Sequence, residues 1–162
     1  SLHLTARHPA WADSAASEAA APLLERPATR ALWDETMRLY PPAWYTARRA
    51  EREDEICGYR IPRHARIVIS PYLLHRHPQF WERPDEFDAA RFLPGRRFSY
   101  FPFGGGPRQC IGNQFALAEG LTALSAFHQR FRIIGAEPAE PTPYPLITLR
   151  MREDLRLRVE RR

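Results

Sequence analysis

The sequence predicts a mainly α-helical domain that also carries small antiparallel sheets, an α+β fold. The chain has 162 residues, which is about the length of one domain. Helix-forming runs fill its first forty residues and the segment after residue 110, whereas short runs with aromatic and β-branched residues lie between and after them. A hydrophobic content of 44% with 27% charged residues is typical of globular proteins and argues against a wholly disordered chain.

Three helices are predicted near the amino terminus. The first covers residues 2–7, and the second, which is rich in Ala, covers residues 11–21 and stops at Pro22. The third covers residues 28–40 and ends at the Pro-Pro pair that follows, because proline cannot continue a helix.

The middle of the chain is predicted to be a small antiparallel sheet followed by irregular chain. Residues 44–49 and 66–70 have strand composition, and the segment between them resembles a hairpin that turns near Gly58. One short helix is expected over residues 71–77. The Pro-rich residues 78–107 are expected to be a long loop, and loops of this length usually carry function.

The most strongly predicted helix covers residues 111–129. Leu117, Leu121 and Leu124 follow the i, i+4, i+7 spacing of a buried helical stripe. Three strands are predicted after this helix: residues 131–134, 145–150 and 155–159.

Composition narrows the classes of function. The net charge is +5, but the basic residues, all Arg, are dispersed among 19 acidic ones, so no continuous track for nucleic acid is formed. Two cysteines are too few for a disulfide scaffold. No apolar run is long enough for a membrane segment, and no secretory signal opens the chain. A cytoplasmic protein of the bacterial soluble type is expected, with an anchor upstream of Ser1 left open.

Cys110 stands at the expected start of the helix over residues 111–129. Free N–H groups of a first helical turn and the helix dipole favour a thiolate there. The glycines at positions 104–106 allow a large flat partner to approach the backbone, and Arg108 can hold a carboxylate or phosphate. These groups together suit an iron-bearing planar cofactor with acidic side groups.

This segment has three other interpretations. The first is a buried structural Cys110 at a helix start. The second is a phosphate-binding glycine loop, which would need a Gly-Lys-Ser/Thr sequence that the chain lacks. The third is a zinc site, but His75, His77 and Cys57 lack the paired spacing of zinc ligands.

The motifs themselves resemble those of a known family. Phe103-x-x-Gly106-x-Arg108-x-Cys110-x-Gly112 matches the haem-binding signature of the cytochrome P450 family at every fixed position. Two further motifs precede it in the family's order and spacing. They are Glu35-Thr36-Met37-Arg38, similar to the family's Glu-x-x-Arg motif, and Phe87-Asp88-Ala89-Ala90-Arg91-Phe92, similar to its meander motif, in which Ala89 replaces the usual Pro.

The resemblance implies a set of roles around haem b (iron protoporphyrin IX). Cys110 would be the axial ligand of the iron and the catalytic residue. Arg108 would pair with a haem propionate, and Arg48, with Arg49 as the neighbouring alternative, would pair with the second. The remaining cofactor-binding residues would be Phe103, which shields the sulfur, Gly104 and Gly112.

The resemblance also implies structural roles. Glu35 and Arg38 would join Arg91 in a buried network that pins the irregular loop and takes no part in catalysis. His75, followed by Arg76, would have a packing and hydrogen-bonding role rather than an iron-ligating one.

The resemblance covers residues 1–162 but only the carboxyl-terminal half of the family's fold, and the central oxygen-activating helix is absent. The implied activity is that of a haem-thiolate monooxygenase. Such an enzyme inserts one oxygen atom of O2 into a small organic substrate and takes electrons from a ferredoxin or flavoprotein reductase. The alternative is a non-catalytic, truncated haem-binding or interaction module.

Overall fold

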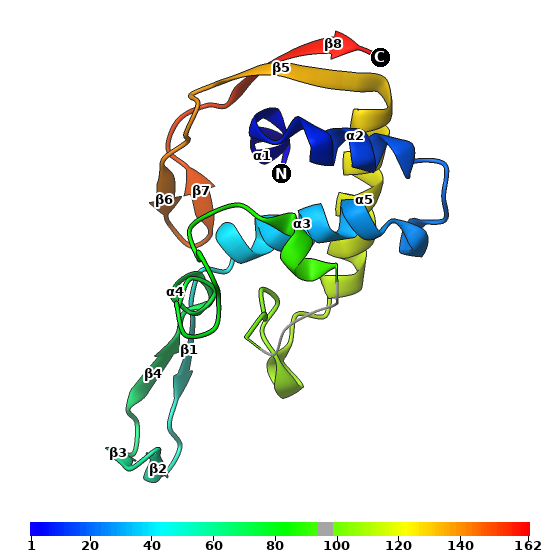
Figure 1. Cartoon of the computed structure of the whole chain (residues 1–162). Coiled ribbons are helices and arrows are strands. Elements are labelled where there is room, and N and C mark those ends of the chain that lie inside the picture. Colours follow the sequence, from blue (N-terminus) through cyan, green and yellow to red (C-terminus); the bar gives the residue numbers. More distant parts are fainter. Residues whose placement is uncertain (94–98) are drawn as a thin grey trace.

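A computed structural model describes residues 1–93 and 99–162. A helical body carries a long two-stranded ribbon that extends away from it (Figure 1). The predicted fold class, mainly helical with small antiparallel sheets, is confirmed. In the part of the chain that the structure describes, no helix has both the length and the apolar content that a membrane span requires.

The helical body is built from four helices. They are α1 (Leu2–Arg7), α2 (Pro9–Ser17), α3 (Pro27–Leu39) and α5 (Asn113–Arg130). Prolines occupy the first position of α2 and of α3, where the missing N–H costs no hydrogen bond. Ala15 of α2, Leu32 of α3 and Leu124 of α5 form one buried cluster, which joins the three helices.

The helix α2 ends at Ser17, earlier than the predicted residue 21. The next residue, Glu18, binds the start of α3 with its side chain. Its carboxylate accepts hydrogen bonds from the N–H groups of Ala28 and Thr29, each at 2.8 Å. These are unpaired donors of the first turn of α3, so Glu18 caps the following helix from a distance.

Gly120 is placed where α3 and α5 approach each other. A Cβ atom added at Gly120 would overlap the ring of Trp33. The two helices can therefore come this close only because residue 120 has no side chain.

Replacing Gly120 with alanine is expected to lower the free energy of unfolding by about 1–3 kcal/mol, since overpacking outweighs the better helix propensity of alanine. Urea denaturation measures this change. Gly105→Ala is the control, because a Cβ there contacts nothing within 4 Å. The addition of Trp33→Phe to Gly120→Ala should restore most of the loss. A Gly120→Ala protein as stable as the wild type would contradict the close approach.

The ribbon of Figure 1 contains two consecutive strand pairs. Strand β1 (Thr46–Arg49) pairs antiparallel with β4 (Arg66–Ile69), and β2 (Asp54–Ile56) pairs with β3 (Tyr59–Ile61) at the far end. The turn between β2 and β3 has positive φ at both central residues, 52° at Cys57 and 81° at Gly58, as a type I′ turn requires. The predicted hairpin near Gly58 is confirmed.

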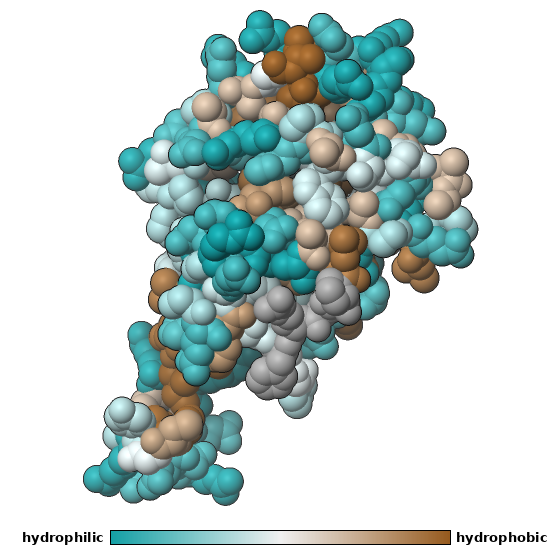
Figure 2. All heavy atoms as spheres, in the orientation of Figure 1, coloured by the Kyte–Doolittle hydropathy of each residue, from teal (hydrophilic) through white to brown (hydrophobic). Residues whose placement is uncertain are grey.

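Large apolar or aromatic side chains lie exposed along the same ribbon: Ile56, Tyr59, Val68 and Ile69. Figure 2 shows brown, apolar surface on this part of the molecule. After β4, Ser70 caps the short helix α4 (Pro71–Leu74) by accepting a hydrogen bond from the Leu73 N–H.

The end of the chain forms two further strand pairs. Strand β5 (Phe131–Glu137) pairs with β8 (Arg156–Arg161), and β6 (Pro143–Pro145) pairs with β7 (Leu149–Met151), all antiparallel. The single strand predicted over residues 145–150 is therefore wrong. The chain reverses there, and contacts from distant residues hold the reversal: Trp44 Nε1 donates to the Leu146 carbonyl at 2.8 Å.

A second buried cluster holds the irregular segment before residue 104. Trp81, Phe92 and Tyr100 pack against Ala31 and Met37 of α3. The only regular structure in the described part of the predicted loop is two 3₁₀ segments, Ala89–Phe92 and Gly106–Arg108. Residues 94–98 of that loop lie outside the described part of the chain. The core thus fixes this segment through side chains rather than through a backbone ladder.

Candidate functional site

Glu35 and Arg38 form a fully buried ion pair. They are three residues apart on α3, so they lie on the same side of the helix. Arg38 Nε donates to Glu35 Oε2 at 2.7 Å, and Arg38 Nη2 donates to Oε1 at 2.8 Å. Neither side chain has any exposed area. Two parallel bonds of this kind give the strongest geometry for an arginine and a carboxylate.

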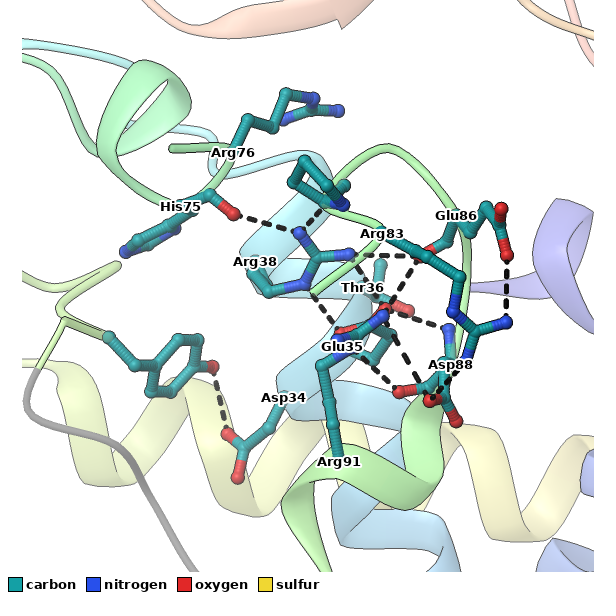
Figure 3. Close-up of polar contacts among 12 residues, drawn as sticks. Asp34, Glu35, Thr36, Arg38, His75, Arg76, Arg83, Glu86, Asp88 and Arg91 are labelled. Carbon is teal, nitrogen blue, oxygen red and sulfur yellow. Dashed lines mark hydrogen bonds and ion pairs between the residues drawn. The ribbon is translucent and has the colours of Figure 1, made fainter. Parts of the chain in front are cut away.

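The other donors of Arg38 hold the irregular chain that follows α4. Nη1 donates to the carbonyls of His75 and Pro84, at 2.8 and 2.6 Å, and Nη2 donates to the Glu86 carbonyl at 3.1 Å. Figure 3 shows the guanidinium of Arg38 between Glu35 and these backbone groups. One side chain on a rigid helix therefore fixes three points of a segment that has no strand partner.

Arg91 reaches the same carboxylate from the 3₁₀ segment. Its Nε lies 3.3 Å from Glu35 Oε1, and its Nη1 donates to the Glu82 carbonyl at 3.0 Å. The Asp88 N–H donates to Glu35 Oε1 at 2.8 Å. The structure thus brings Glu35, Arg38 and Arg91 together. The carboxylate of Glu35 accepts from both arginines and from the Asp88 N–H.

The loop that carries Cys110 is folded by its own backbone. The Gly104 N–H donates to the Phe101 carbonyl at 2.9 Å, and the Cys110 N–H donates to the Phe103 carbonyl at 3.0 Å. Gly104 and Gly106 have φ of 72° and 69°, values that residues with a side chain rarely adopt. Glycine is therefore required here by the turn itself.

Cys110 lies before α5, not in its first turn. The helix begins at Asn113, and Gly112 is the residue that caps it. This corrects the sequence expectation that a helix starting at residue 111 activates the sulfur through its first N–H groups. The backbone bonds show why: the Asn113 N–H donates to the Cys110 carbonyl, three residues back, at 3.4 Å, and a bond of α-helical spacing runs from the Ala116 N–H to the Gly112 carbonyl at 2.9 Å.

The thiol of Cys110 is exposed. Within residues 1–93 and 99–162 it has no hydrogen-bond partner, so the interpretation as a buried structural cysteine is wrong. Gly112 is close, since a Cβ added there would lie 3.9 Å from the sulfur. A soft ligand atom is thus available at the surface of a loop that its own backbone hydrogen bonds fold.

The surroundings of Cys110 fit a flat apolar group with acidic substituents. A Cβ at Gly104, Gly105 or Gly106 would meet nothing within 4 Å, so the loop surface is open. Ile111, which follows the cysteine in the chain, and Phe115, in the first turn of α5, present apolar side chains that are exposed to 102% and 74%. Arg108 is exposed and forms no ion pair with any residue that the structure describes. The hollow lined by Phe101, Phe103 and Gly104 is only about 60 Å³, too small for a large ligand.

Two residues predicted to bind the cofactor have other partners. The guanidinium of Arg48 folds back on its own strand, where Nη1 donates to Thr46 Oγ1 at 2.8 Å and to the Ala47 carbonyl at 2.9 Å. In the described part of the chain, no hydrogen bond or ion pair joins Arg48 to the Cys110 loop, and its pairing with a haem propionate stays a prediction. Phe103 is half-buried, and its ring packs on the cluster around Trp81, so it anchors the loop to the core.

Sequence reasoning missed two contacts that attach the loop to the body. The Tyr100 hydroxyl donates to Asp34 Oδ1 at 2.9 Å, beside Glu35 on α3. The Phe101 N–H donates to the imidazole Nε2 of His75 at 3.1 Å. No spacing in the sequence reveals these pairs, because the partners are 66 and 26 residues apart.

Comparisons with known proteins agree with the motifs. The family model described as Cytochrome P450 matches residues 19–154. Cyclooctatin synthase of Streptomyces melanosporofaciens is 41% identical over an alignment of 126 residues, which covers 75% of this chain and 28% of that protein. Pentalenene oxygenase of Streptomyces avermitilis is 35% identical over an alignment of 133 residues, which covers 79% of this chain and 30% of that protein.

A solved structure gives the same result for the fold. The crystal structure of a 6-coordinated cytochrome P450 from Thermus thermophilus superposes with a TM-score of 0.85 at 35% identity. The match covers 96% of this chain and 41% of that one. The chain therefore spans less than a third of the two curated relatives and about two fifths of the solved structure.

Proposed function

Since the chain belongs to the cytochrome P450 family, we propose that it is the carboxyl-terminal part of a haem-thiolate monooxygenase, with Cys110 as the axial ligand of haem b. The observation that carries this proposal is the exposed Cys110 thiol on a backbone-folded glycine loop. That loop is attached to a buried charged network in the helical body.

Four residues of this chain would bind the haem. Cys110 would donate its thiolate to the iron, which increases electron density there. Arg108 would neutralise a haem propionate through a charge-assisted hydrogen bond. Ile111 and Phe115 would lose their exposure to water against the apolar edge of the porphyrin.

The network of Glu35, Arg38 and Arg91 would serve the site without touching the cofactor. It would keep the Pro-rich chain and the Cys110 loop in one conformation, so that ligation does not have to order them. When bound, the haem would supply O2 activation, with one oxygen atom inserted into an organic substrate and the other reduced to water. The electrons would come from a ferredoxin or flavoprotein reductase.

The test is ligation of haem by the protein itself. The chain is reconstituted with haem, reduced and exposed to CO, and the Soret band is expected to shift strongly to the red, as thiolate ligation gives. Cys110→Ala should remove this band. Cys57→Ala is the matched control, since Cys57 is also an exposed thiol but lies on the hairpin turn. A spectrum that Cys110→Ala leaves unchanged, or that Cys57→Ala abolishes, would refute the assignment.

A further inference from the structure

We infer that His75 is a positioning residue for Cys110, because its imidazole Nε2 holds the Phe101 N–H at the base of the Cys110 loop. The donor and acceptor are 3.1 Å apart. His75 follows α4, whereas Phe101 precedes the glycine turn, so the bond joins two irregular segments.

The position of the imidazole is fixed from several directions. His75 is fully buried. Its carbonyl accepts the 2.8 Å bond from Arg38 Nη1, so the backbone of residue 75 is part of the buried network. Its ring lies edge-on to the rings of Trp81 and Phe101, with centroids 6.3 and 5.2 Å away. A ring packed in this way presents Nε2 in one direction only.

A short series of hydrogen bonds runs from His75 to the cysteine. The Phe101 N–H is held by His75, and the Phe101 carbonyl accepts from the Gly104 N–H. The Phe103 carbonyl in turn accepts from the Cys110 N–H. His75 is therefore one direct connection between the Glu35 and Arg38 pair and the loop that places the sulfur.

The bond requires a neutral ring with its proton on Nδ1, because only an unprotonated Nε2 can accept a hydrogen bond. Burial lowers the pKa of His75 to about 4, so the ring is neutral at pH 7. Hydrophobic packing alone would be satisfied by phenylalanine. Acceptance from the Phe101 N–H needs an acceptor at the position of Nε2, which the side-chain oxygen of glutamine can supply.

Amide hydrogen exchange of the haem-free chain tests the positioning directly, with His75→Phe and His75→Gln compared with the wild type. In His75→Phe, exchange at Phe101, Gly104 and Cys110 should be about tenfold faster, since a hydrogen bond of ordinary strength is lost. Exchange within α5 should not change. His75→Gln should restore slow exchange at these three amides. Equal exchange in His75→Phe and wild type, or no restoration by glutamine, would overturn the inference.

The consequence for iron ligation rests on the proposed role of Cys110 and is measured separately. With haem, reduction and CO, His75→Phe should give less of the red-shifted thiolate band than the wild type, and His75→Gln should recover it. Loss of the band in all variants and in the wild type would refute the proposed function but not the positioning, which the exchange data decide.

A measurement on the unaltered chain covers the case in which His75→Phe does not fold. Nitrogen NMR of ¹⁵N-labelled histidine should show His75 with a proton on Nδ1 and an unprotonated Nε2. A proton on Nε2 at pH 7 would overturn the inference without any variant.

Discussion

Replacing Glu35 with alanine is expected to destabilise the protein by about 3–5 kcal/mol, because it leaves buried charges without their counter-ion. Arg38 would lose both of its bonds to carboxylate, and Arg91 would lose its contact with Oε1. The Asp88 N–H would lose its acceptor as well. The irregular chain from residue 75 to residue 91 depends on these donors, so it should loosen first.

Urea denaturation measures the stability, and the yield of haem-bound protein measures the effect on the site. Glu35→Ala should retain less haem, whereas the spectrum of the haem that remains should be that of the wild type, since the role proposed for the network involves no contact with the cofactor. Glu119→Ala is the matched control, because Glu119 lies on α5, away from the buried network. An equal haem yield in Glu35→Ala and Glu119→Ala would contradict the proposed role of the network.

Acidification from pH 7 to pH 5 is expected to cost about 2 kcal/mol of stability for each of two buried histidines. Burial lowers the pKa of His75 and of His128 to about 4, whereas an unfolded histidine has a pKa of about 6.5. Between these values the unfolded chain binds more protons than the folded one. The contribution of the two histidines to the free energy of unfolding is therefore fully present above pH 6.5 and is lost as the pH falls toward 4.

His128→Leu separates the two contributions. His128 is fully buried on α5, and neither ring nitrogen has a hydrogen-bond partner among the residues described. Leucine should therefore be tolerated there and should remove about half of the stability lost between pH 7 and pH 5 in urea denaturation. A wild-type stability that does not change over this range would show that the two rings do not stay neutral in the folded state.

The fold was predictable where local chemistry decides it. The Pro-Pro pair after α3 and the Cys57-Gly58 turn each depend on backbone limits that a few residues impose. The β6 and β7 pair was missed because it depends on Trp44, about a hundred residues away in the chain, which bonds to the Leu146 carbonyl. A pattern within one segment cannot contain that contact.

The site was predictable as a set of residues but not as a set of contacts. The motifs named Glu35, Arg38 and Arg91, and the structure brings these side chains together. Arg38 also donates to three backbone carbonyls, and these contacts hold the irregular chain. Every residue has a backbone carbonyl, so the sequence does not show which ones accept. The start of α5 was misplaced for a related reason, since the bond from the Asn113 N–H to the Cys110 carbonyl joins backbone groups and leaves no signal in the residue pattern.

X-ray absorption at the iron edge tests the central proposal most directly, because it detects the atoms bound to iron. For the chain reconstituted with haem, one sulfur neighbour of the iron is predicted, and Cys110→Ala should replace it with a nitrogen or oxygen neighbour. An iron with no sulfur neighbour in the wild type, or with a sulfur that persists in Cys110→Ala, would contradict the assignment of Cys110 as the ligand.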